Sequence, residues 1–442
     1  MRASPRPPRK IKPRYRPQAA RRERILAHIG EGVAVIPTAA EKTRSRDTTY
    51  PYRFDSDFWY LTAFPEPDAV LVLAGGRSIL FCREKDATRE VWEGFRHGPK
   101  AAKEVFGFDA AFPISSLETR LPRLLADRPA LWHALGQDSE NDARVIRALN
   151  AARGMSRTDR RAPALLCDLQ QTLDAMRRVK DAAELALMRQ AAGIATAGHL
   201  RAMRACRPGM FEHELEAELG YEFRRRGAAG HAYAPIVAGG GNACVLHYTA
   251  NDKRLPDAGL ALIDAGCEVQ GYAADISRTF PVNGRFSAAQ KDCYEIVLAA
   301  QAAAVAAIRP GAGFDAPHMA AVRVLTQGMA DLRLLSGTVD GLVESGAYQR
   351  FYMHRTGHWL GLDVHDAGDY RQGKAWVPLE ADMTLTVEPG LYIRPAADVP
   401  EHLHNMGIRI EDDVVVTKQG CQVYTHAPRT VAEIEEVMQE RD

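Results

Sequence analysis

The stretch ALIDAGCEVQGYAADISRTFP at residues 261–281 constrains the fold more than any other part of this chain. An apolar run ends at Asp264, a turn-rich segment covers residues 266–271, and a second extended run contains Asp275. We expect two strands joined by a turn, each placing one carboxylate near the other. Two acidic groups in apolar surroundings are costly unless a cation lies between them. A metal ion is one candidate for that cation, and Arg278 is the other.

Two more acidic residues stand within apolar segments nearer the C-terminus. Glu388 interrupts MTLTVEPGLYI, where an acid must be paired, protonated or bound to metal. Glu411 follows Arg409 in GIRIEDDVVVT, which we expect to be one strand with alternating faces. A rigid strand presents Glu411 well as a ligand, and the alternative is an Arg–Glu face at the surface.

Three histidines, His354, His358 and His365, fall within the twelve residues that end FYMHRTGHWLGLDVH. Glycines separate them, so we expect loops and strands rather than one helix face. Histidines beside carboxylates favour a metal or acid–base site, and their apolar neighbours argue against three surface histidines. The candidate ligand set is therefore Asp264, Asp275, His358, Glu388 and Glu411. Four carboxylates and one imidazole suit Mn²⁺, Co²⁺ or Fe²⁺, and that much negative charge fits two divalent ions better than one.

The bulk properties narrow the class of protein. A length of 442 residues predicts two or three domains: a disordered basic tail at 1–20, an N-terminal α/β domain at 21–173 and a C-terminal domain at 174–442. The aromatic segment DFWYLTAF of the N-terminal domain is expected to be a strand. The net charge of +1 favours neither nucleic acid nor an anionic membrane as a partner. Seven scattered cysteines without CxxC spacing indicate a reducing compartment and a cytoplasmic location.

The chain resembles the Xaa-Pro aminopeptidases (aminopeptidase P, proline aminopeptidase II), which are grouped with methionine aminopeptidase, prolidase and creatinase. The matching stretches are TRSRDTTYPYRFDSDFWYLTAF, CRPGMFEHELEAEL, VLHYTAND, LIDAGCEVQGYAADISRTFPVNG, FYMHRTGHWLGLDVHD, LTVEPGLYI and GIRIEDDVVVT. They cover nearly everything after the basic tail. The resemblance implies a C-terminal pita-bread α/β (α+β) fold that holds two divalent metal ions, usually Mn²⁺. It also implies an N-terminal α/β domain that helps to build a homotetramer.

The resemblance assigns a role to each candidate ligand. Asp264 would chelate one metal ion, and Asp275 and Glu411 would bridge both ions. His358 and Glu388 would complete the coordination of the second ion.

Four further residues match positions around the substrate. His247 would lie near the scissile bond. His354 and His365 would stabilise the developing tetrahedral charge or hold the proline side. Arg409 would support Glu411 and the substrate.

Three residues of the N-terminal domain, Trp92, Arg157 and Asp47, resemble residues that this domain contributes near the site. Without the resemblance, Trp92 is a polar-aromatic residue of REVWEGFRHG with no other candidate site residue nearby, and we expect it to have a role in structural packing. The chain departs from the family after His365, where DYRQGKAW, with Arg371 and Lys374, replaces a YGQDR-like segment. That departure leaves the partner of Arg157 open.

The implied reaction is hydrolysis of the Xaa-Pro bond at the N-terminus of a peptide. A hydroxide bridging two divalent ions attacks the carbonyl, because the metals lower the pKa of water. Histidines donate to the oxyanion, and Glu388 passes a proton toward the proline nitrogen. Three alternatives stay open: a prolidase that cuts only dipeptides, a non-metal enzyme such as creatinase, and a binding module without catalysis. All five ligand positions are occupied by suitable residues, which disfavours the last two.

Overall fold

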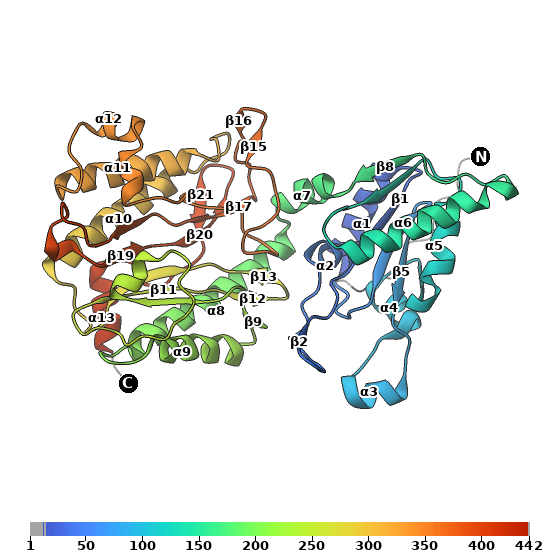
Figure 1. Cartoon of the computed structure of the whole chain (residues 1–442), viewed down its shortest axis with the longest axis horizontal. Helices are drawn as coiled ribbons and strands as arrows, with labels where there is room; N and C mark the ends of the chain where they lie inside the picture. Colours follow the sequence, from blue (N-terminus) through green and yellow to red (C-terminus); the bar gives the residue numbers. More distant parts are fainter. Residues whose placement is uncertain (1–11, 13–14, 441–442) are drawn as a thin grey trace. The chain divides into compact units, whose positions relative to one another are not determined.

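The computed structural model describes residue 12 and residues 15–440 of the chain. Two compact units make up the chain, Met1–Leu173 and Asp174–Asp442 (Figure 1). Among the described residues, no helix combines the length and the apolar character that crossing a membrane requires.

The first unit is built on a six-stranded mixed sheet with the order β6-β5-β4-β1-β7-β8. Its strands are β1 (Val33–Pro37), β2 (Thr43–Ser45), β3 (Thr48–Thr49), β4 (Val70–Ala74), β5 (Arg77–Cys82), β6 (Ala110–Pro113), β7 (Ala130–His133) and β8 (Leu165–Asp168). Its helices are α1 (Arg16–Ile29), α2 (Ser56–Thr62), α3 (Ala87–Glu93), α4 (Gly98–Phe106), α5 (Leu117–Leu125) and α6 (Ser139–Gly154), with short 3₁₀ turns η2 (Ile114–Ser116) and η3 (Met155–Thr158). Leu121 of α5 and Val145 of α6 pack with the buried valines of β1 and β4 in one apolar cluster.

The segment DFWYLTAF contains a helix and not the expected strand. Residues Ser56–Thr62 form α2, and Asp55 Oδ1 accepts the Phe58 N–H at 2.8 Å. This N-cap satisfies a backbone group that a helix otherwise leaves without a partner. Local capping therefore outweighs the preference of aromatic residues for strands.

The predicted basic tail ends earlier than residue 20. Residues 1–11, 13 and 14 lie outside the described part of the chain, but α1 begins at Arg16, so the prediction of disorder is wrong for residues 16–20. Pro17 stands in the first turn of α1, where a missing N–H costs nothing. The buried Arg22 then anchors the helix by donating to the Leu61 carbonyl at 2.8 Å.

The second unit holds several short sheets between two pairs of helices (Figure 1). Its helices are α7 (Gln170–Arg178, shared with the end of the first unit), α8 (Ala182–Ala205), α9 (Glu212–Arg225), α10 (Ala288–Ala307), α11 (Ala316–Asp331), α12 (Val339–Glu344) and α13 (Val431–Gln439), with 3₁₀ turns η4 (Gly240–Cys244), η5 (Ala347–Arg350) and η6 (Glu401–Leu403). Its strands are β9 (Gly230–His231), β10 (Ile236–Gly239), β11 (Leu260–Asp264), β12 (Cys267–Val269), β13 (Tyr272–Ala273), β14 (Ser277–Pro281), β15 (Arg371–Gln372), β16 (Ala375–Trp376), β17 (Thr384–Val387), β18 (Gly390–Ile393), β19 (Met406–Arg409), β20 (Asp412–Val416) and β21 (Cys421–Val423). The α8–α9 pair and the α10–α11 pair lie on opposite sides of these strands.

The stretch around Asp275 is more broken than the two expected strands. β12 and β13 form a hairpin that also pairs with β9, whereas β14 pairs with β11. Asp275 lies in the break between β13 and β14. The chain crosses itself closely here, because a Cβ on Gly266 would stand 1.7 Å from the Ala274 carbonyl oxygen.

A second break separates β19 from β20, where one continuous strand is expected. β19 pairs with β18, whereas β20 pairs with β17. Glu411 falls between them, and its N–H donates to the Ser277 carbonyl oxygen at 3.0 Å. Arg409 and Glu411 are both buried, so the alternative of a surface Arg–Glu face is wrong.

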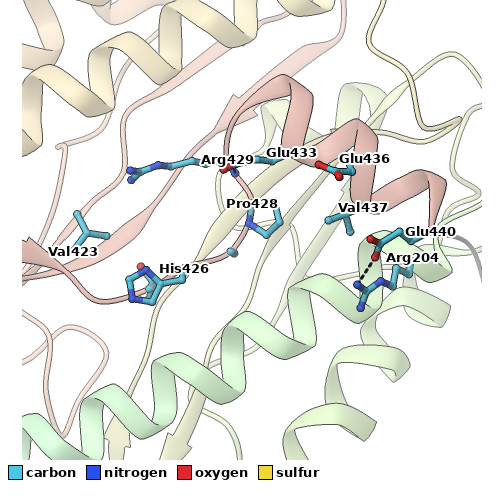
Figure 2. A pocket seen from close by; sticks show the side chains of 11 residues that line it. Arg204, Val423, His426, Pro428, Arg429, Glu433, Glu436, Val437 and Glu440 are labelled. Carbon is cyan, nitrogen blue, oxygen red and sulfur yellow. Dashed lines mark hydrogen bonds and ion pairs between the residues drawn. The ribbon is translucent and has the colours of Figure 1, made fainter.

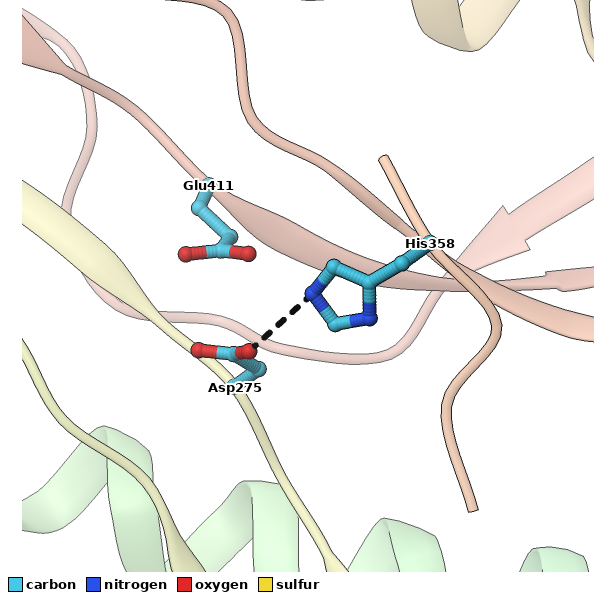
Figure 3. Close-up of side chains that lie close together, drawn as sticks. All are labelled: Asp275, His358 and Glu411. Carbon is cyan, nitrogen blue, oxygen red and sulfur yellow. Dashed lines mark ion pairs between the residues drawn. The ribbon is translucent and has the colours of Figure 1, made fainter. Parts of the chain in front are cut away.

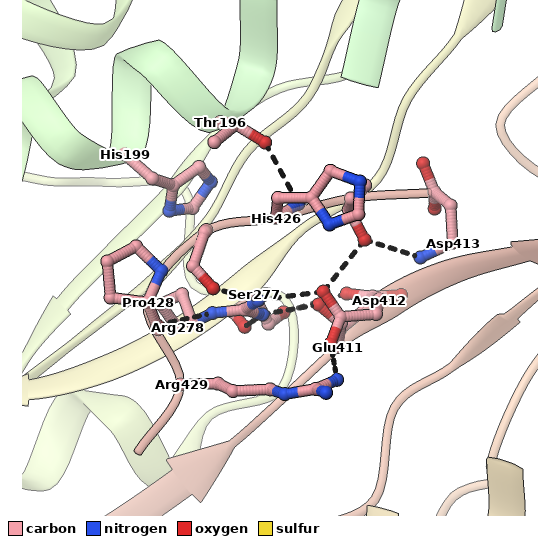
Figure 4. Close-up of polar contacts among 12 residues, drawn as sticks. Thr196, His199, Ser277, Arg278, Glu411, Asp412, Asp413, His426, Pro428 and Arg429 are labelled. Atoms are coloured by element: carbon pink, nitrogen blue, oxygen red, sulfur yellow. Dashed lines mark hydrogen bonds and ion pairs between the residues drawn. The ribbon is translucent and has the colours of Figure 1, made fainter. Parts of the chain in front are cut away.

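Arg278 ties these broken strands together (Figure 4). Its fully buried guanidinium forms a 2.7 Å ion pair with Asp412. It also donates to four main-chain oxygens at 2.6–2.9 Å, those of Ser277, Glu411, Ala427 and Pro428. Because this cation is paired with Asp412, the alternative that Arg278 neutralises Asp264 and Asp275 is wrong.

Removing the Arg278 charge should destabilise the second unit strongly. Arg278→Leu leaves the buried Asp412 with only its longer 3.4 Å ion pair to Arg429, and removing one partner of a buried ion pair costs about 3–5 kcal/mol. The thermal unfolding midpoint, followed at a fixed scan rate, measures the loss. Arg323→Leu is the matched control, because the 2.9 Å Arg323–Asp340 pair is exposed and such pairs contribute about 0–1 kcal/mol. Equal midpoints for the two variants would show that the buried pair has no special role.

Candidate metal centre and active site

Two strand ends bring Asp264 and Asp275 together. Asp264 is the last residue of β11, and the antiparallel register places it opposite Ser277, the first residue of β14. Asp275 precedes Ser277 by two residues, so both carboxylates emerge at the same end of the sheet. The Tyr233 hydroxyl lies 2.7 Å from Asp264 Oδ1 and also hydrogen-bonds Asp275, which holds the pair in place.

Glu388 and Glu411 meet where one strand ladder ends and the next begins. The β17–β20 pairing stops just before Glu388 and the β18–β19 pairing starts just after it, so both glutamates occupy the junction. The loop that carries His358 runs beside β17, because the His358 carbonyl accepts the Thr386 N–H at 3.0 Å. Three distant segments of the chain therefore present side chains to one place.

Asp275, His358 and Glu411 form the tightest group of candidate ligands (Figure 3). Each offers one ligand atom, and these atoms lie within 4.8 Å of one another. His358 Nε2 is 3.5 Å from Asp275 Oδ2 and 3.7 Å from Glu388 Oε1. His358 Nδ1 lies 2.9 Å from the Trp359 carbonyl oxygen, a contact that orients the ring and leaves Nε2 facing the carboxylates.

One cavity of about 1080 Å³ collects every predicted site residue of the second unit. Its walls contain the five candidate ligands together with His247, His354, His365 and Arg409. His354 Nδ1 lies 3.8 Å from Glu388 Oε2, and the rings of His358 and His365 are 4.3 Å apart. The cavity is large enough for several residues of a peptide.

Arg409 supplies positive charge beside these carboxylates. Its Nη2 forms a 2.7 Å ion pair with Asp264 Oδ2, and its Nε donates to Ser277 Oγ at 2.8 Å. Ser277 Oγ in turn donates to Glu411 Oε2 at 2.8 Å. One arginine thus orients a carboxylate at the end of β11 and another in the break between β19 and β20.

Tyr233 and Tyr392 are site residues that the sequence analysis does not identify. The Tyr392 hydroxyl lies 2.8 Å from His354 Nε2 and accepts from Arg409 Nη1 at 3.0 Å. Both tyrosines stand in or beside short apolar strands, where tyrosine is an ordinary core residue. In the sequence, the only signal for a site role of Tyr392 is that it follows closely after Glu388 in MTLTVEPGLYI.

The buried carboxylates are electrostatically crowded. Burial raises the pKa of Glu388 to about 7, and it raises the pKa of Asp264 and of Glu411 as well. Burial acts the same way on Asp275, but the His358 hydrogen bond and charge outweigh it and lower the pKa of that acid. This set of donors is buried, rich in oxygen atoms and negatively charged, and such a set fits divalent cations.

Trp92, Arg157 and Asp47 all belong to the first unit. Trp92 lies on α3 and is 85% exposed, so the alternative of internal packing for this residue is wrong. Arg157 lies on η3 and Asp47 between β2 and β3, and both are exposed. Their role near the substrate stays a prediction.

The family of the chain follows from comparison with known proteins. A model of metallopeptidase family M24 matches residues 186–418, and a model of the aminopeptidase P N-terminal domain matches residues 18–132. The chain therefore belongs to metallopeptidase family M24. This confirms the predicted fold class, an N-terminal α/β domain followed by the catalytic domain of a metal-dependent peptide hydrolase.

Within this family the similarity is to Xaa-Pro aminopeptidases along nearly the whole chain. The Escherichia coli (strain K12) Xaa-Pro aminopeptidase is 45% identical over 411 residues, which cover 92% of this chain and 93% of that protein. The Haemophilus influenzae Xaa-Pro aminopeptidase is 43% identical over 425 residues, covering 95% and 96%. The structure of Pseudomonas aeruginosa aminopeptidase PepP superposes with a TM-score of 0.95 at 48% identity, covering 97% and 98%. The resemblance found in the sequence is thus confirmed.

The metal-free protein should lose stability as the pH rises. The pKa of Glu388 moves from an ordinary 4.5 to about 7 on folding, so its stabilising contribution is complete below about pH 4.5 and is lost as the pH rises through about 7. We expect the Tm of EDTA-treated protein to fall more steeply between about pH 5 and pH 8 than that of Glu388→Gln, which has no proton to lose there.

Differential scanning fluorimetry at several pH values measures this difference. Excess Mn²⁺ should flatten the wild-type slope, because a metal ion and protons compete for the same carboxylates. Parallel slopes for wild type and Glu388→Gln would contradict the electrostatic crowding inferred above.

Proposed function

We propose that the protein removes the N-terminal residue from peptides whose second residue is proline. The convergence of five ligand-type side chains in one large cavity carries this proposal. The named relatives support it, as does a structure of Escherichia coli aminopeptidase P in complex with substrate, which matches this chain with a TM-score of 0.94 at 44% identity.

The candidate ligands would hold two divalent metal ions per subunit, with Mn²⁺ as the proposed metal. Asp264 would serve one ion, Asp275 and Glu411 would serve both, and His358 and Glu388 would serve the other. Two bound divalent cations supply Lewis acidity, which polarises a peptide carbonyl and makes water nucleophilic at neutral pH. A zinc-substituted structure of Escherichia coli aminopeptidase P in complex with product is among the similar structures, at 44% identity and a TM-score of 0.94.

The remaining side chains bind the peptide and move protons. Burial lowers the pKa of His354 to about 3, so its imidazole is neutral; its Nε2, which lies 2.8 Å from the Tyr392 hydroxyl, would exchange this partner for a developing oxyanion. His247 and His365 line the same cavity. His247 would lie near the scissile bond, and His365 would stabilise the developing tetrahedral charge or hold the proline side. Glu388 accepts a proton from the attacking water and passes it to the proline nitrogen as the bond breaks. Arg409 keeps Asp264 and, through Ser277, Glu411 in place.

A substrate panel separates this activity from the prolidase alternative. We expect the Mn²⁺-loaded protein to release alanine from Ala-Pro-Ala-Ala amide and to leave Ala-Ala-Ala-Ala amide intact. Cleavage of the dipeptide Ala-Pro alone would identify a prolidase. Metal binding without hydrolysis of any peptide would identify a binding module.

Glu411 and His354 should separate metal binding from catalysis. Glu411→Ala removes a ligand shared by both ions, so we expect fewer than two metal ions per chain and no turnover. His354→Ala keeps the ligand set, so we expect full metal content and a kcat lowered about 10²–10³-fold, the usual cost of one oxyanion donor. Metal analysis after desalting and initial rates on Ala-Pro-Ala-Ala amide test both. Full metal content with normal turnover in Glu411→Ala would disprove the ligand assignment.

We further propose a cytoplasmic homotetramer in which Trp92 and Arg157 take part in substrate binding. The seven cysteines are all free, which supports a reducing compartment. α3 buries none of its residues, and Val91, Trp92 and Phe95 are 81%, 85% and 67% exposed, as expected of a surface that another subunit covers. Light scattering should give the mass of four chains, and Trp92→Ser should lower kcat/KM. A monomer with unchanged kcat/KM in Trp92→Ser would refute both.

A further inference from the structure

Two arginines of the active-site cavity share one aromatic ring. Arg355 follows His354 in its loop, Arg371 belongs to β15, and Trp376 belongs to the partner strand β16. The Cζ atoms of Arg355 and Arg371 lie 4.8 and 3.8 Å from the centroid of the Trp376 ring. All three residues line the cavity that contains the candidate metal ligands. The indole therefore holds two guanidinium groups at the cavity wall.

Neither guanidinium is neutralised within the described part of the chain. No ion pair there includes Arg355 or Arg371, and the Arg371 side chain makes only a 3.4 Å hydrogen bond to the Lys374 carbonyl oxygen. Asp369 lines the same cavity but pairs with neither of them. Asp315 interacts electrostatically with Arg355 without reaching ion-pair distance.

The two arginines also act on each other. Burial lowers the pKa of Arg355, and the charge of Arg371 contributes in the same direction. Two like charges held on one ring repel each other, and an anion that binds both of them removes this repulsion. A carboxylate matches the planar fork of a guanidinium and is the anion that peptides carry.

The charges in the cavity set the direction of a bound peptide. In the proposed function the amino group of the first residue binds beside the candidate ligands Asp264, Asp275, Glu388 and Glu411, and no ion pair links Arg355 or Arg371 to any of them. An ammonium group is repelled by the two arginines. The chain that follows proline therefore runs toward Trp376.

We propose that Arg355 and Arg371, held on the Trp376 ring, form a subsite for a carboxylate on the part of the substrate that follows proline. The carboxylate is either an acidic side chain directly after proline or the C-terminal carboxylate of a tripeptide. This subsite deepens the proposed function and rests on it, because it takes the proline side of the substrate as the side that meets the arginines.

Four peptides test the subsite with the Mn²⁺-loaded full-length protein. Ala-Pro-Glu-Ala amide and Ala-Pro-Lys-Ala amide differ in side-chain charge, and Ala-Pro-Ala with a free or an amidated C-terminus differs in terminal charge. One charge-assisted contact contributes about tenfold in kcat/KM. We expect the glutamate peptide to exceed the lysine peptide by at least about this factor, or the free acid to exceed the amide, with a preference that declines as NaCl is added. A preference for the glutamate peptide shows that the subsite binds a side-chain carboxylate. A preference only for the free acid shows that the subsite binds the C-terminal carboxylate.

Variants tie the preference to these two residues. In the double variant Arg355→Gln/Arg371→Gln, the ratio of kcat/KM between the two peptides of the preferred pair should fall to about one. Lys374→Gln is the matched control, because Lys374 lies on the same hairpin, is exposed and does not line the cavity, so its ratio should equal that of wild type. No preference in wild type, or an undiminished preference in the double variant, overturns the proposal.

A binding measurement keeps the subsite testable if no peptide is hydrolysed. Calorimetry with the product-like peptides Pro-Glu-Ala amide and Pro-Lys-Ala amide needs no turnover. Tighter binding of the glutamate peptide, lost in the double variant, supports the subsite even when the proposed activity fails. Equal Kd values overturn it whether or not the protein is a peptidase.

Discussion

Four carboxylates are held together in the interior of this protein against their mutual repulsion. Asp264 ends a strand, Asp275, Glu388 and Glu411 lie in breaks between strands, and burial alone makes their charged forms costly. A polypeptide keeps such a group together only when the framework around it is rigid and when cations complete it. The folding of the second unit and the chemistry of the cavity both follow from this electrostatic constraint.

Two arginines stabilise the protein around these carboxylates, each in a different way. Arg409 reaches into the site and contacts Asp264 and Ser277 directly. Arg278 is turned away from the site, is fully buried against Asp412, and fastens the backbone on either side of the carboxylates. Because Arg278 binds mainly main-chain oxygens, it fixes strand positions without neutralising the acids, which leaves their charge for divalent cations.

The strand breaks explain why the ligands point into the cavity. A continuous strand alternates its side chains between two faces, so neighbouring residues diverge. At the β13–β14 and β19–β20 breaks the chain leaves one sheet and enters another, and Asp275 and Glu411 lie at these steps. The aromatic and cationic residues Trp376, Arg355 and Arg371 belong to the wall of the same cavity, where we propose that the substrate extends beyond its first two residues.

Much of this site was readable from residue types and their positions. Acids inside apolar runs, at Asp264, Asp275 and Glu388, had to be paired, protonated or bound to metal, because an unpaired charged carboxylate is costly there. The histidine cluster at His354 to His365 was correctly assigned to irregular structure by its glycines. Family resemblance added His247 and Arg409, which no local pattern marks, and the cavity contains both.

Other features depended on contacts between residues far apart in the chain. The strand expected at DFWYLTAF is helical because of one cap at Asp55, and the start of α1 depends on a burial of Arg22 that no local pattern reveals. The partner of Arg278 could not be deduced, because Asp412 is more than a hundred residues away and competes with nearer acids. The sequence by itself determined which side chains could serve as ligands, since residue type and apolar surroundings are local properties. Only the tertiary structure decided which of them meet, since pairing between distant strands sets their distances.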